Sequence, residues 1–192
     1  MLFRSGMNPA KGNTDDGAIE WFSYVNFPTA GDYVMVVNSD DGFRLTTARN
    51  AKDRMGDVIS SFNAGRGAGT GVGAGTQQRV IVEQAGVYPI RGLMFNRGGG
   101  FDVEWYTRDG DNLYLVNSNS TPQALQAWTS ATGTGAYVNS AIPVRSAVDV
   151  PGNQKIIIEL ANGTTTVNGG SIVLKVDGNT VSPTITDRKS VV

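Results

Sequence analysis

Two adjacent carboxylates offer the most specific chemistry in this sequence. Asp40 and Asp41 follow the apolar run Tyr33–Val37 and precede Gly42. Charge at the exit of an apolar strand is tolerated only where water, hydrogen bonds or a cation balances it. The pair could therefore hold a hard cation through its oxygens, or it could accept hydrogen bonds from the backbone amides of a turn. The residues alone leave both interpretations open, and they do not name a ligand.

The composition excludes several classes of function. The 192 residues include no cysteine and no histidine, which excludes thiol catalysis, zinc fingers, disulfides and every triad that uses imidazole as its base. Any metal must then be a hard cation held by oxygen ligands. The net charge of −1, without a basic run, argues against nucleic acid as a partner. No apolar run approaches the roughly 18 residues of a membrane span, so we predict no membrane insertion.

The elements that position the carboxylates read as β-strands. Residues 18–27 alternate with period 2, and the turn at 28–32 leads into the apolar run, which predicts a hairpin. Five apolar residues in a row predict a central strand that is covered on both faces. We expect further strands at 43–47, 78–83, 87–95, 101–106 and 113–116, with 57–62 left open between a strand and a helical turn. The sequence therefore predicts an all-β antiparallel sandwich.

One short helix is expected after the last of these strands. Thr121 is a suitable cap, Pro122 suits the first helical position, and Leu125 and Trp128 would face the core. The residues that follow, 129–140, read as a polar loop.

A glycine-rich segment lies between two predicted strands. Residues 64–76 contain six glycines, one at every second position. A phosphate-binding loop would end in Gly-Lys-Ser/Thr and lead into a helix, and both features are missing. Because ordering so much glycine costs conformational entropy, we predict a flexible surface excursion.

Two other acidic pairs invite a functional interpretation. Asp102 and Glu104 share the outer face of one strand, as a glycosidase pair could, but two acids on a wet strand face are more simply solvated. Asp109 and Asp111 resemble the start of a calcium loop, but the downstream acidic ligand is missing, so we predict a hairpin turn. Neither pair indicates catalysis.

The tryptophans could in principle form a platform on which sugars stack. Trp21 and Trp105 fall on inward faces of their strands by alternation. Core packing is therefore the better interpretation for these two.

The C-terminal part of the chain differs from the rest in its sequence pattern. From Ala147 the sequence reads as a linker and then as strands at 155–160, 166–167 and 171–176, followed by a turn at 177–179. About forty residues are too few to close a sandwich. We interpret them as the opening strands of a second β domain.

The two ends look like translated sequencing-adapter sequence. We expect residues 1–5 and 187–192 to be such scars, on a metagenomic fragment of a longer gene, although both could be ordinary tails. The expected domains are then 6–145, lacking its N-terminal strands, and 146–186, the start of the second domain.

Three segments in order resemble the PA14 family, a β-sandwich module of bacterial toxins, glycosidases and adhesins. They are 31–45, with its Ser-Asp-Asp-Gly-Phe-Arg-Leu, 85–91, with Ala-Gly-Val-Tyr-Pro-Ile-Arg, and 98–105, with Gly-Gly-Gly-Phe-Asp-Val-Glu-Trp. The resemblance covers Ala18 to about Tyr106, and the usual opening strands before Ala18 are missing. The tail from Lys155 resembles the immunoglobulin-like repeats that follow such modules in large secreted bacterial proteins.

The resemblance implies a site and a function. In the sugar-binding PA14 lectins of yeast adhesins, two consecutive aspartates joined by a cis peptide bind calcium, and the calcium binds sugar hydroxyls. Asp40 and Asp41 are the corresponding positions. The third calcium-binding loop and the aromatic residue beside the sugar cannot be identified in this sequence. Many PA14 members also keep Asp-Asp-Gly here with no established calcium site.

We therefore expect a non-catalytic carbohydrate-binding or adhesive module of a larger secreted or cell-surface bacterial protein. Its partners would be a glycan or cell-surface polysaccharide and the neighbouring domains of the same polypeptide, which could include an enzyme. Asp40 and Asp41 would form the ligand site, through calcium if they bind a metal. The alternative is a structural spacer without a ligand of its own.

Overall fold

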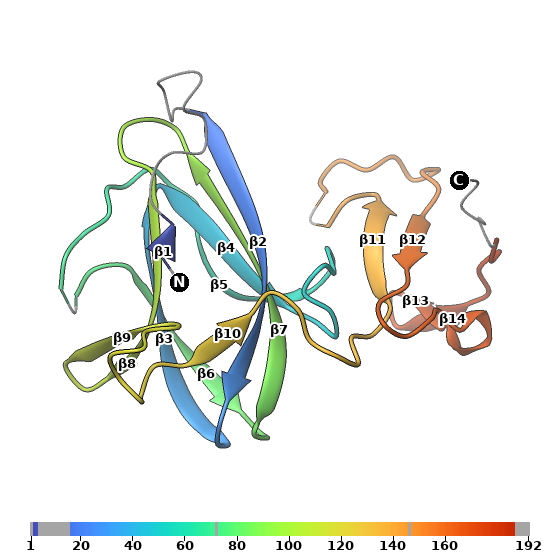
Figure 1. Cartoon of the computed structure of the whole chain (residues 1–192). Coiled ribbons are helices and arrows are strands. Elements are labelled where there is room, and N and C mark those ends of the chain that lie inside the picture. Colours follow the sequence, from blue (N-terminus) through green and yellow to red (C-terminus); the bar gives the residue numbers. More distant parts are fainter. Residues whose placement is uncertain (1, 4–15, 72, 146, 187–192) are drawn as a thin grey trace, which may run out of the picture.

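The computed structural model describes residues 2–3, 16–71, 73–145 and 147–186 (Figure 1). Within these ranges the regular structure is β, apart from a short 3-10 turn at Gly169–Ser171. The strands are β1 (Leu2–Phe3), β2 (Gly17–Phe27), β3 (Gly31–Asp40), β4 (Gly42–Thr47), β5 (Asp57–Phe62), β6 (Thr76–Val82), β7 (Gly86–Asn96), β8 (Asp102–Asp109), β9 (Asn112–Leu115), β10 (Gln126–Trp128), β11 (Tyr137–Ile142), β12 (Ile157–Ala161), β13 (Leu174–Val176) and β14 (Asn179–Val181).

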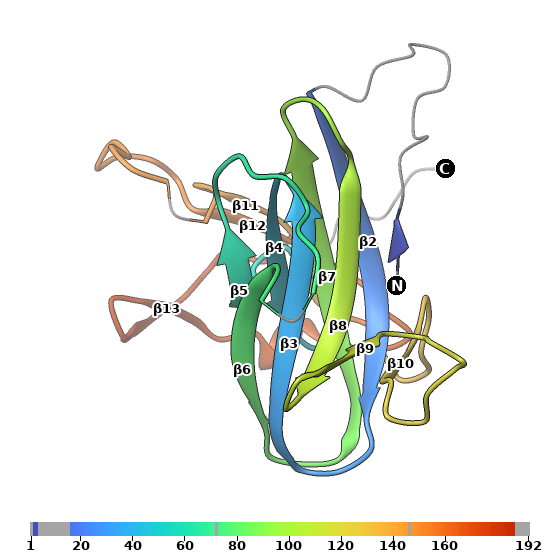
Figure 2. The ribbon, with the colours of Figure 1, turned by 90° about the vertical axis from the view of Figure 1, so that its left-hand side faces the viewer.

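Two antiparallel sheets form a sandwich, which confirms the predicted fold class. The first sheet has the order β1-β8-β3-β6, with β9 also paired to β8. The second sheet has the order β10-β2-β7-β4-β5. Figure 2 looks onto the first sheet, with the second sheet behind it. The chain crosses from one sheet to the other between β3 and β4, where Asp40 and Asp41 lie.

The core lies between the two sheets and is built from alternate residues of their strands. Its best-buried side chains, each no more than 1% exposed, include Val25, Val37, Leu45, Met94 and Trp105. Strand alternation places these side chains on the inner faces, as the sequence predicts. Trp105 and its fellow core residue Trp21 thus pack inside rather than forming a surface platform.

Strand β3 is central and covered on both faces, as its apolar run predicts. It pairs with β8 on one side and with β6 on the other. The consecutive residues Met35, Val36 and Val37 are all buried, although alternation points Val36 away from the core. The glycine-rich segment after β5 accounts for this burial, because Val36 and Gly69 line the same groove on the outer face.

The predicted helix is wrong. Residues 121–124 form a turn in which the Ala124 amide donates to the Thr121 carbonyl at 3.2 Å, and the chain continues into strand β10. Strand β10 pairs with the open edge of β2, which offers more hydrogen bonds than one helical turn would. Leu125 is buried, but Trp128 is 49% exposed, so the prediction that Trp128 faces the core is also wrong.

The C-terminal strands form two small ladders, β11 with β12 and β13 with β14. The β13–β14 turn at Asp177-Gly178 has the positive φ angles of a tight hairpin turn, as expected. Strand β11 lies mostly within the segment predicted as a loop, and the short strand predicted at 166–167 is not formed. Both predictions are wrong. Neither stretch alternates between apolar and polar residues as a strand with one packed face does, so the sequence pattern could not tell strand from loop there.

The ladder of β11 and β12 also joins residues from both sides of the expected boundary at 145/146. The division into domains stays a prediction. Most of the residues in the expected terminal scars lie outside the described ranges. The exceptions are Leu2 and Phe3, whose backbone pairs with Val103 and Glu104 of β8.

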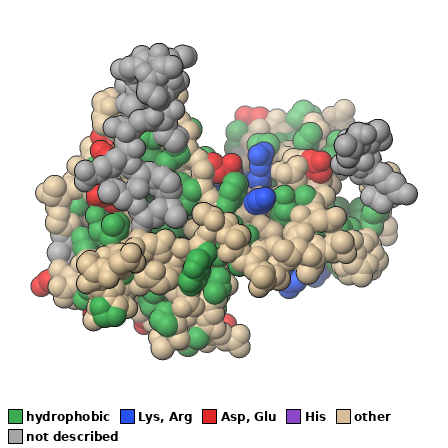
Figure 3. Space-filling view, viewed as in Figure 1, with side chains coloured by type: hydrophobic (Ala, Val, Ile, Leu, Met, Phe, Trp, Pro, Cys, Tyr) green, Lys and Arg blue, Asp and Glu red, His purple; other side chains and the backbone are tan. Residues whose placement is uncertain are grey.

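Few apolar side chains of the C-terminal strands are buried. Ile157, Ile158 and Leu160 on β12 are exposed, together with Val181 on β14 and Val173 just before β13. Figure 3 shows apolar side chains at the surface over this region, on the right. In the described ranges, none of the helical structure is long and apolar enough to cross a membrane.

Candidate functional site

Asp40 and Asp41 lie at the corner where the chain passes from the first sheet to the second. Asp40 ends β3, and Gly42 starts β4. The peptide between the two aspartates is cis, as the family resemblance implies. A side chain at Gly42 would overlap the ring of Phe95 and the carbonyl of Phe62, so only glycine fits at this corner.

Asp41 accepts hydrogen bonds from two loops. Its Oδ1 accepts from the backbone amide of Arg66 at 2.7 Å, and its Oδ2 accepts from the backbone amide of Arg97 at 2.8 Å. The residue is only 6% exposed. Asp41 therefore holds the glycine-rich segment and the turn after β7 against the same corner. This arrangement matches the second interpretation of the pair, in which backbone amides satisfy a carboxylate.

Asp40 has a different environment. It pairs in register with Asp102 of β8 and accepts a hydrogen bond from the backbone amide of Ala68. Burial, followed by the negative charges of Asp41 and Asp102, raises the pKa of Asp40, and the Ala68 hydrogen bond opposes this rise. Among the described residues, no ion pair involves Asp40, Asp41 or Asp102. Asp40 thus carries a negative charge that no neighbouring cation compensates.

The turn of residues 96–100 forms one wall beside Asp40. The side chain of Asn96 is buried, and its oxygen accepts a hydrogen bond from the Gly98 amide at 3.2 Å. A Cβ atom at Gly100 would lie 2.6 Å from Oδ2 of Asp40, so a glycine leaves the space next to this carboxylate open. Sequence reasoning treated these residues only as a turn. The three consecutive glycines were the available sequence signal that this turn packs closely against a neighbouring side chain.

The glycine-rich segment forms the opposite wall, and Arg66 anchors it. The guanidinium donates from Nε to the Ser39 carbonyl at 3.0 Å, from Nη2 to the Val37 carbonyl at 3.0 Å, and from Nη1 to Thr76 Oγ1 at 2.9 Å. Its central carbon lies 4.2 Å from the ring centroid of Phe62. Burial lowers the pKa of Arg66. The segment lies on the surface as predicted, with Arg66 as its anchor, and its flexibility stays a prediction.

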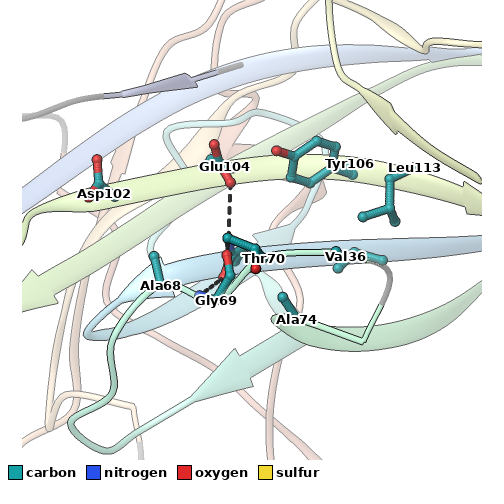
Figure 4. A pocket seen from close by; sticks show the side chains of 11 residues that line it. Val36, Ala68, Gly69, Thr70, Ala74, Asp102, Glu104, Tyr106 and Leu113 are labelled. Carbon is teal, nitrogen blue, oxygen red and sulfur yellow. Dashed lines mark hydrogen bonds between the residues drawn. The ribbon is translucent and has the colours of Figure 1, made fainter.

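Asn38 fixes the middle of the same segment. Its side chain donates to the Gly69 carbonyl at 2.9 Å and accepts from the Gly69 amide at 3.0 Å. Asn38 also donates to Glu104 of β8 at 2.9 Å. Figure 4 shows Gly69 and Glu104 facing one another across the outer side of the first sheet, with Asp102 next to them on β8.

A groove of about 460 Å³ runs between the glycine-rich segment and β8. Asp102, Glu104 and Tyr106 line it from β8, and Gly69 lines it from the segment. Asp102 and Glu104 thus point outward on one strand face, as predicted. Hydrogen bonding to Asn38 already occupies one oxygen of Glu104.

The oxygens around Asp40 are suited to a hard cation. Asp40 and Asp102 pair in register and supply carboxylates, which are ligands that calcium takes, and the turn of residues 96–100 packs next to Asp40 through Gly100. Each oxygen of Asp41 keeps a second lone pair beyond its amide hydrogen bond. Nowhere in the described ranges do three acidic, histidine or cysteine side chains converge into a metal cage. Backbone and ligand oxygens would therefore have to complete the coordination of a cation at this corner.

Asp109 and Asp111 belong to a separate feature. They flank Gly110 in the two-residue turn between β8 and β9, where Asp109 pairs with Asn112. The hairpin turn predicted from the sequence is confirmed.

No protein-family model matches this sequence, and no curated protein matches it. Similar solved structures include a PA14 sugar-binding domain from an RTX adhesin, at 17% identity and a TM-score of 0.40, covering 53% of this chain and 52% of that one. The A domain of epithelial adhesin 9 from Candida glabrata, in complex with Galb1-3GlcNAc, is similar at 15% identity and a TM-score of 0.43, covering 62% and 56%. This chain therefore spans about half the length of the structures that it matches.

Proposed function

We propose that this protein contains a non-catalytic carbohydrate-binding or adhesive module, with Asp40 at the centre of the binding site. The observation that carries the proposal is the uncompensated carboxylate of Asp40, which lies between two anchored loops. Anchored loops around a carboxylate that has no ion-pair partner are typical of a preformed binding site rather than a simple turn.

Calcium is the cofactor that suits this site best. Asp40 and Asp41 would hold it, with Asp102 and the carbonyls of residues 97–99 as further oxygen donors. When bound, calcium supplies open coordination positions that vicinal sugar hydroxyls can fill. The residues of the chain position the ligand by holding the two loops at fixed places around Asp40. The role that we propose is one of binding, and no residue of the site is assigned a catalytic role.

The proposal extends to the context of the module. A sugar-binding domain of this kind would act at the surface of a bacterial cell or in secreted form, as one part of a larger polypeptide. Its partner would be a glycan or a cell-surface polysaccharide, with neighbouring domains that determine what the binding is used for.

A structural spacer is the second candidate. The hydrogen bonds from two backbone amides to Asp41 favour it, because they give this carboxylate a structural role that requires no ligand. The two candidates differ at Asp40. A binding module requires its carboxylate, whereas a structural spacer does not.

Calorimetric titration of calcium into chelator-treated protein tests the proposal. We expect binding in the micromolar to millimolar range that is lost in Asp40→Asn and kept in Asp111→Asn. The second variant is a matched control because the Asp111 side chain is 99% exposed on the distal hairpin. A folded protein that shows no calcium heat would leave the spacer as the better account.

A glycan array with and without calcium gives the second readout. We expect at least one glycan to bind, and we expect this binding to require both calcium and Asp40. Glycan binding that depends on neither calcium nor Asp40 would contradict the proposed site. The protein would then bind carbohydrate through other residues.

A further inference from the structure

The groove beside Asp40 extends beyond the cation site, with which it shares Asp102. We propose that it is an extended subsite that binds further sugar units of a neutral oligosaccharide whose first unit lies at Asp40. This inference rests on the proposed function and specifies the class of ligand as a chain of sugars rather than a single sugar.

The groove and the Asp40 site share residues. Ala68 lines the groove, and its backbone amide donates to Asp40. Asp102 lines the groove and pairs in register with Asp40. From Asp102 the groove follows β8 to Tyr106, a length of about 13 Å at the usual rise of a strand. A chain of sugars that starts at Asp40 would thus continue into the groove without leaving the surface.

The lining combines the two kinds of group that carbohydrates contact. The carboxylate of Glu104 and the carbonyl of Gly69 can accept hydrogen bonds from hydroxyls. The ring of Tyr106 and the side chain of Leu113, both partly exposed, offer apolar surface to the C–H faces of a pyranose. Figure 4 shows Asp102, Glu104, Tyr106 and Leu113 following one another along one side of the groove, opposite Ala68 and Gly69.

Charge decides which sugars the groove accepts. The described lining residues include the acids Asp102 and Glu104 and no lysine or arginine. Beyond the calcium site, sugar acids such as uronic or sialic acids would meet the like charge of Glu104, which is not among the proposed calcium donors. Neutral sugars would not, so we infer a preference for neutral chains.

Hydrogen bonds to β3 hold the outer wall of the groove at two places. Arg66 anchors its start, and the paired hydrogen bonds between Asn38 and Gly69 fix its middle. A wall that is held before the ligand arrives does not lose this entropy on binding. The extension could therefore add affinity with each sugar unit.

The test measures affinity against chain length in the presence of calcium. The probes are mono-, di-, tri- and tetrasaccharides of glucose, mannose, galactose and N-acetylglucosamine, with a uronic-acid trisaccharide for the charge argument. For the best neutral series we expect affinity to rise about tenfold from one unit to three. Tyr106→Ala should remove about tenfold for the trisaccharide and less than about twofold for the monosaccharide.

Trp128→Ala is the matched control, because Trp128 is a surface aromatic residue on the other sheet. It should leave all affinities unchanged, and Tyr106→Phe should keep most of the chain-length effect. If Tyr106→Ala fails to fold, Leu113→Ala probes the same end of the groove. Circular dichroism and thermal melts verify the fold of each variant.

Three outcomes would overturn the inference. A monosaccharide that binds as tightly as its trisaccharide, with Tyr106→Ala and Leu113→Ala both harmless, would exclude the groove while leaving the proposed function intact. Tighter binding of the uronic-acid chain would contradict the charge argument. No binding of any probe by the wild-type protein, with or without calcium, would contradict the proposed function as well.

Discussion

The sandwich and the C-terminal strands are built from similar amounts of apolar sequence, but they use it differently. In the sandwich, apolar residues alternate with polar ones, and the alternating set forms one core. On β12 the neighbouring residues Ile157 and Ile158 are both exposed. Backbone pairing alone thus accounts for the C-terminal ladders, whereas pairing and core packing together account for the sandwich. Because Asp40 and Asp41 lie at a corner of the sandwich, the site takes its rigidity from that core.

The largest expected effect comes from truncating one large apolar side chain in each region. Trp105→Ala should lower the free energy of unfolding by about 4 kcal/mol, because it leaves a cavity between the sheets. Ile158→Ala, at a position that is 42% exposed, should change it by no more than about 0.5 kcal/mol. Urea denaturation followed by circular dichroism measures both. Equal costs would mean that the C-terminal strands share a cooperative core with the sandwich.

Glycine-to-alanine substitutions should also destabilise the sandwich more than the C-terminal part. A Cβ atom at Gly92 would overlap the indole of its cross-strand partner Trp21, whereas a Cβ atom at Gly152 would meet nothing within 4 Å. We expect Gly92→Ala to destabilise the protein by about 2–3 kcal/mol and Gly152→Ala to have almost no effect. Thermal melts of the two variants provide the comparison. A tolerant Gly92 would show that the indole can move aside and that the sheets pack less tightly than we infer.

Two aspartates that each accept two backbone amides give a finer comparison. Asp41 binds the Arg66 and Arg97 amides inside the sandwich. Asp53 binds the Met55 and Val138 amides, and so joins the sandwich to β11. In an asparagine variant, one amide would face an NH2 group instead of an oxygen.

We expect Asp41→Asn to cost roughly 2–3 kcal/mol and Asp53→Asn about 1 kcal/mol, because Asp41 is the more deeply buried of the two. Hydrogen exchange of the Arg66 and Arg97 amides should accelerate in the first variant only. Unchanged exchange at both amides would contradict the role of Asp41 as the residue that holds the two loops.

The smallest expected effect concerns Asp40 and pH. Its raised pKa means that the folded protein binds this proton more readily than the unfolded chain does. Stability from this group is thus highest when Asp40 is protonated, and it falls as pH rises from about 3.9 to the raised pKa of the folded state. Above that range the ionised group destabilises the fold by a constant amount.

Asp40→Asn should therefore remove this pH dependence and raise the melting temperature at pH 7 by roughly 1–3 °C. Melting curves from pH 3 to pH 8, recorded without calcium, check the expectation. A variant that is less stable than the wild type at pH 7 would show that the Asp40 carboxylate contributes to the fold. The site would then lose its clearest difference from Asp41.

Local patterns predicted the corner well, because its signals are contiguous in the chain. An apolar run followed by Asp-Asp-Gly indicates a strand exit whatever the rest of the fold, and the alternation of residues 101–106 places Trp105 inside. The helix prediction at Thr121 failed for the opposite reason. Thr-Pro is a local signal for a helix start, but the open edge of β2, far away in the sequence, determines the conformation of residues 126–128.

The walls of the site could not be predicted for the same reason. Arg66 bonds to Val37, Ser39 and Thr76, and Arg97 bonds to Asp41 through its backbone. Nothing in the glycine-rich segment itself indicates these partners. A lone arginine between glycines was the one signal that the segment has an anchor.

The short strand β10 also has a mechanical consequence. It pairs with β2 through three residues, whereas β2 pairs with β7 through eleven. Because β10 runs antiparallel to β2, its exit at Trp128 points toward the end of β2 at which the chain enters, at Gly17. Tension applied across the sandwich would load the Trp128–Tyr24 pair first and then the other two pairs in turn, as a zipper opens. The molecule could thus lengthen under load by releasing β10 while the corner at Asp40, which belongs to β3 and β4, keeps its shape.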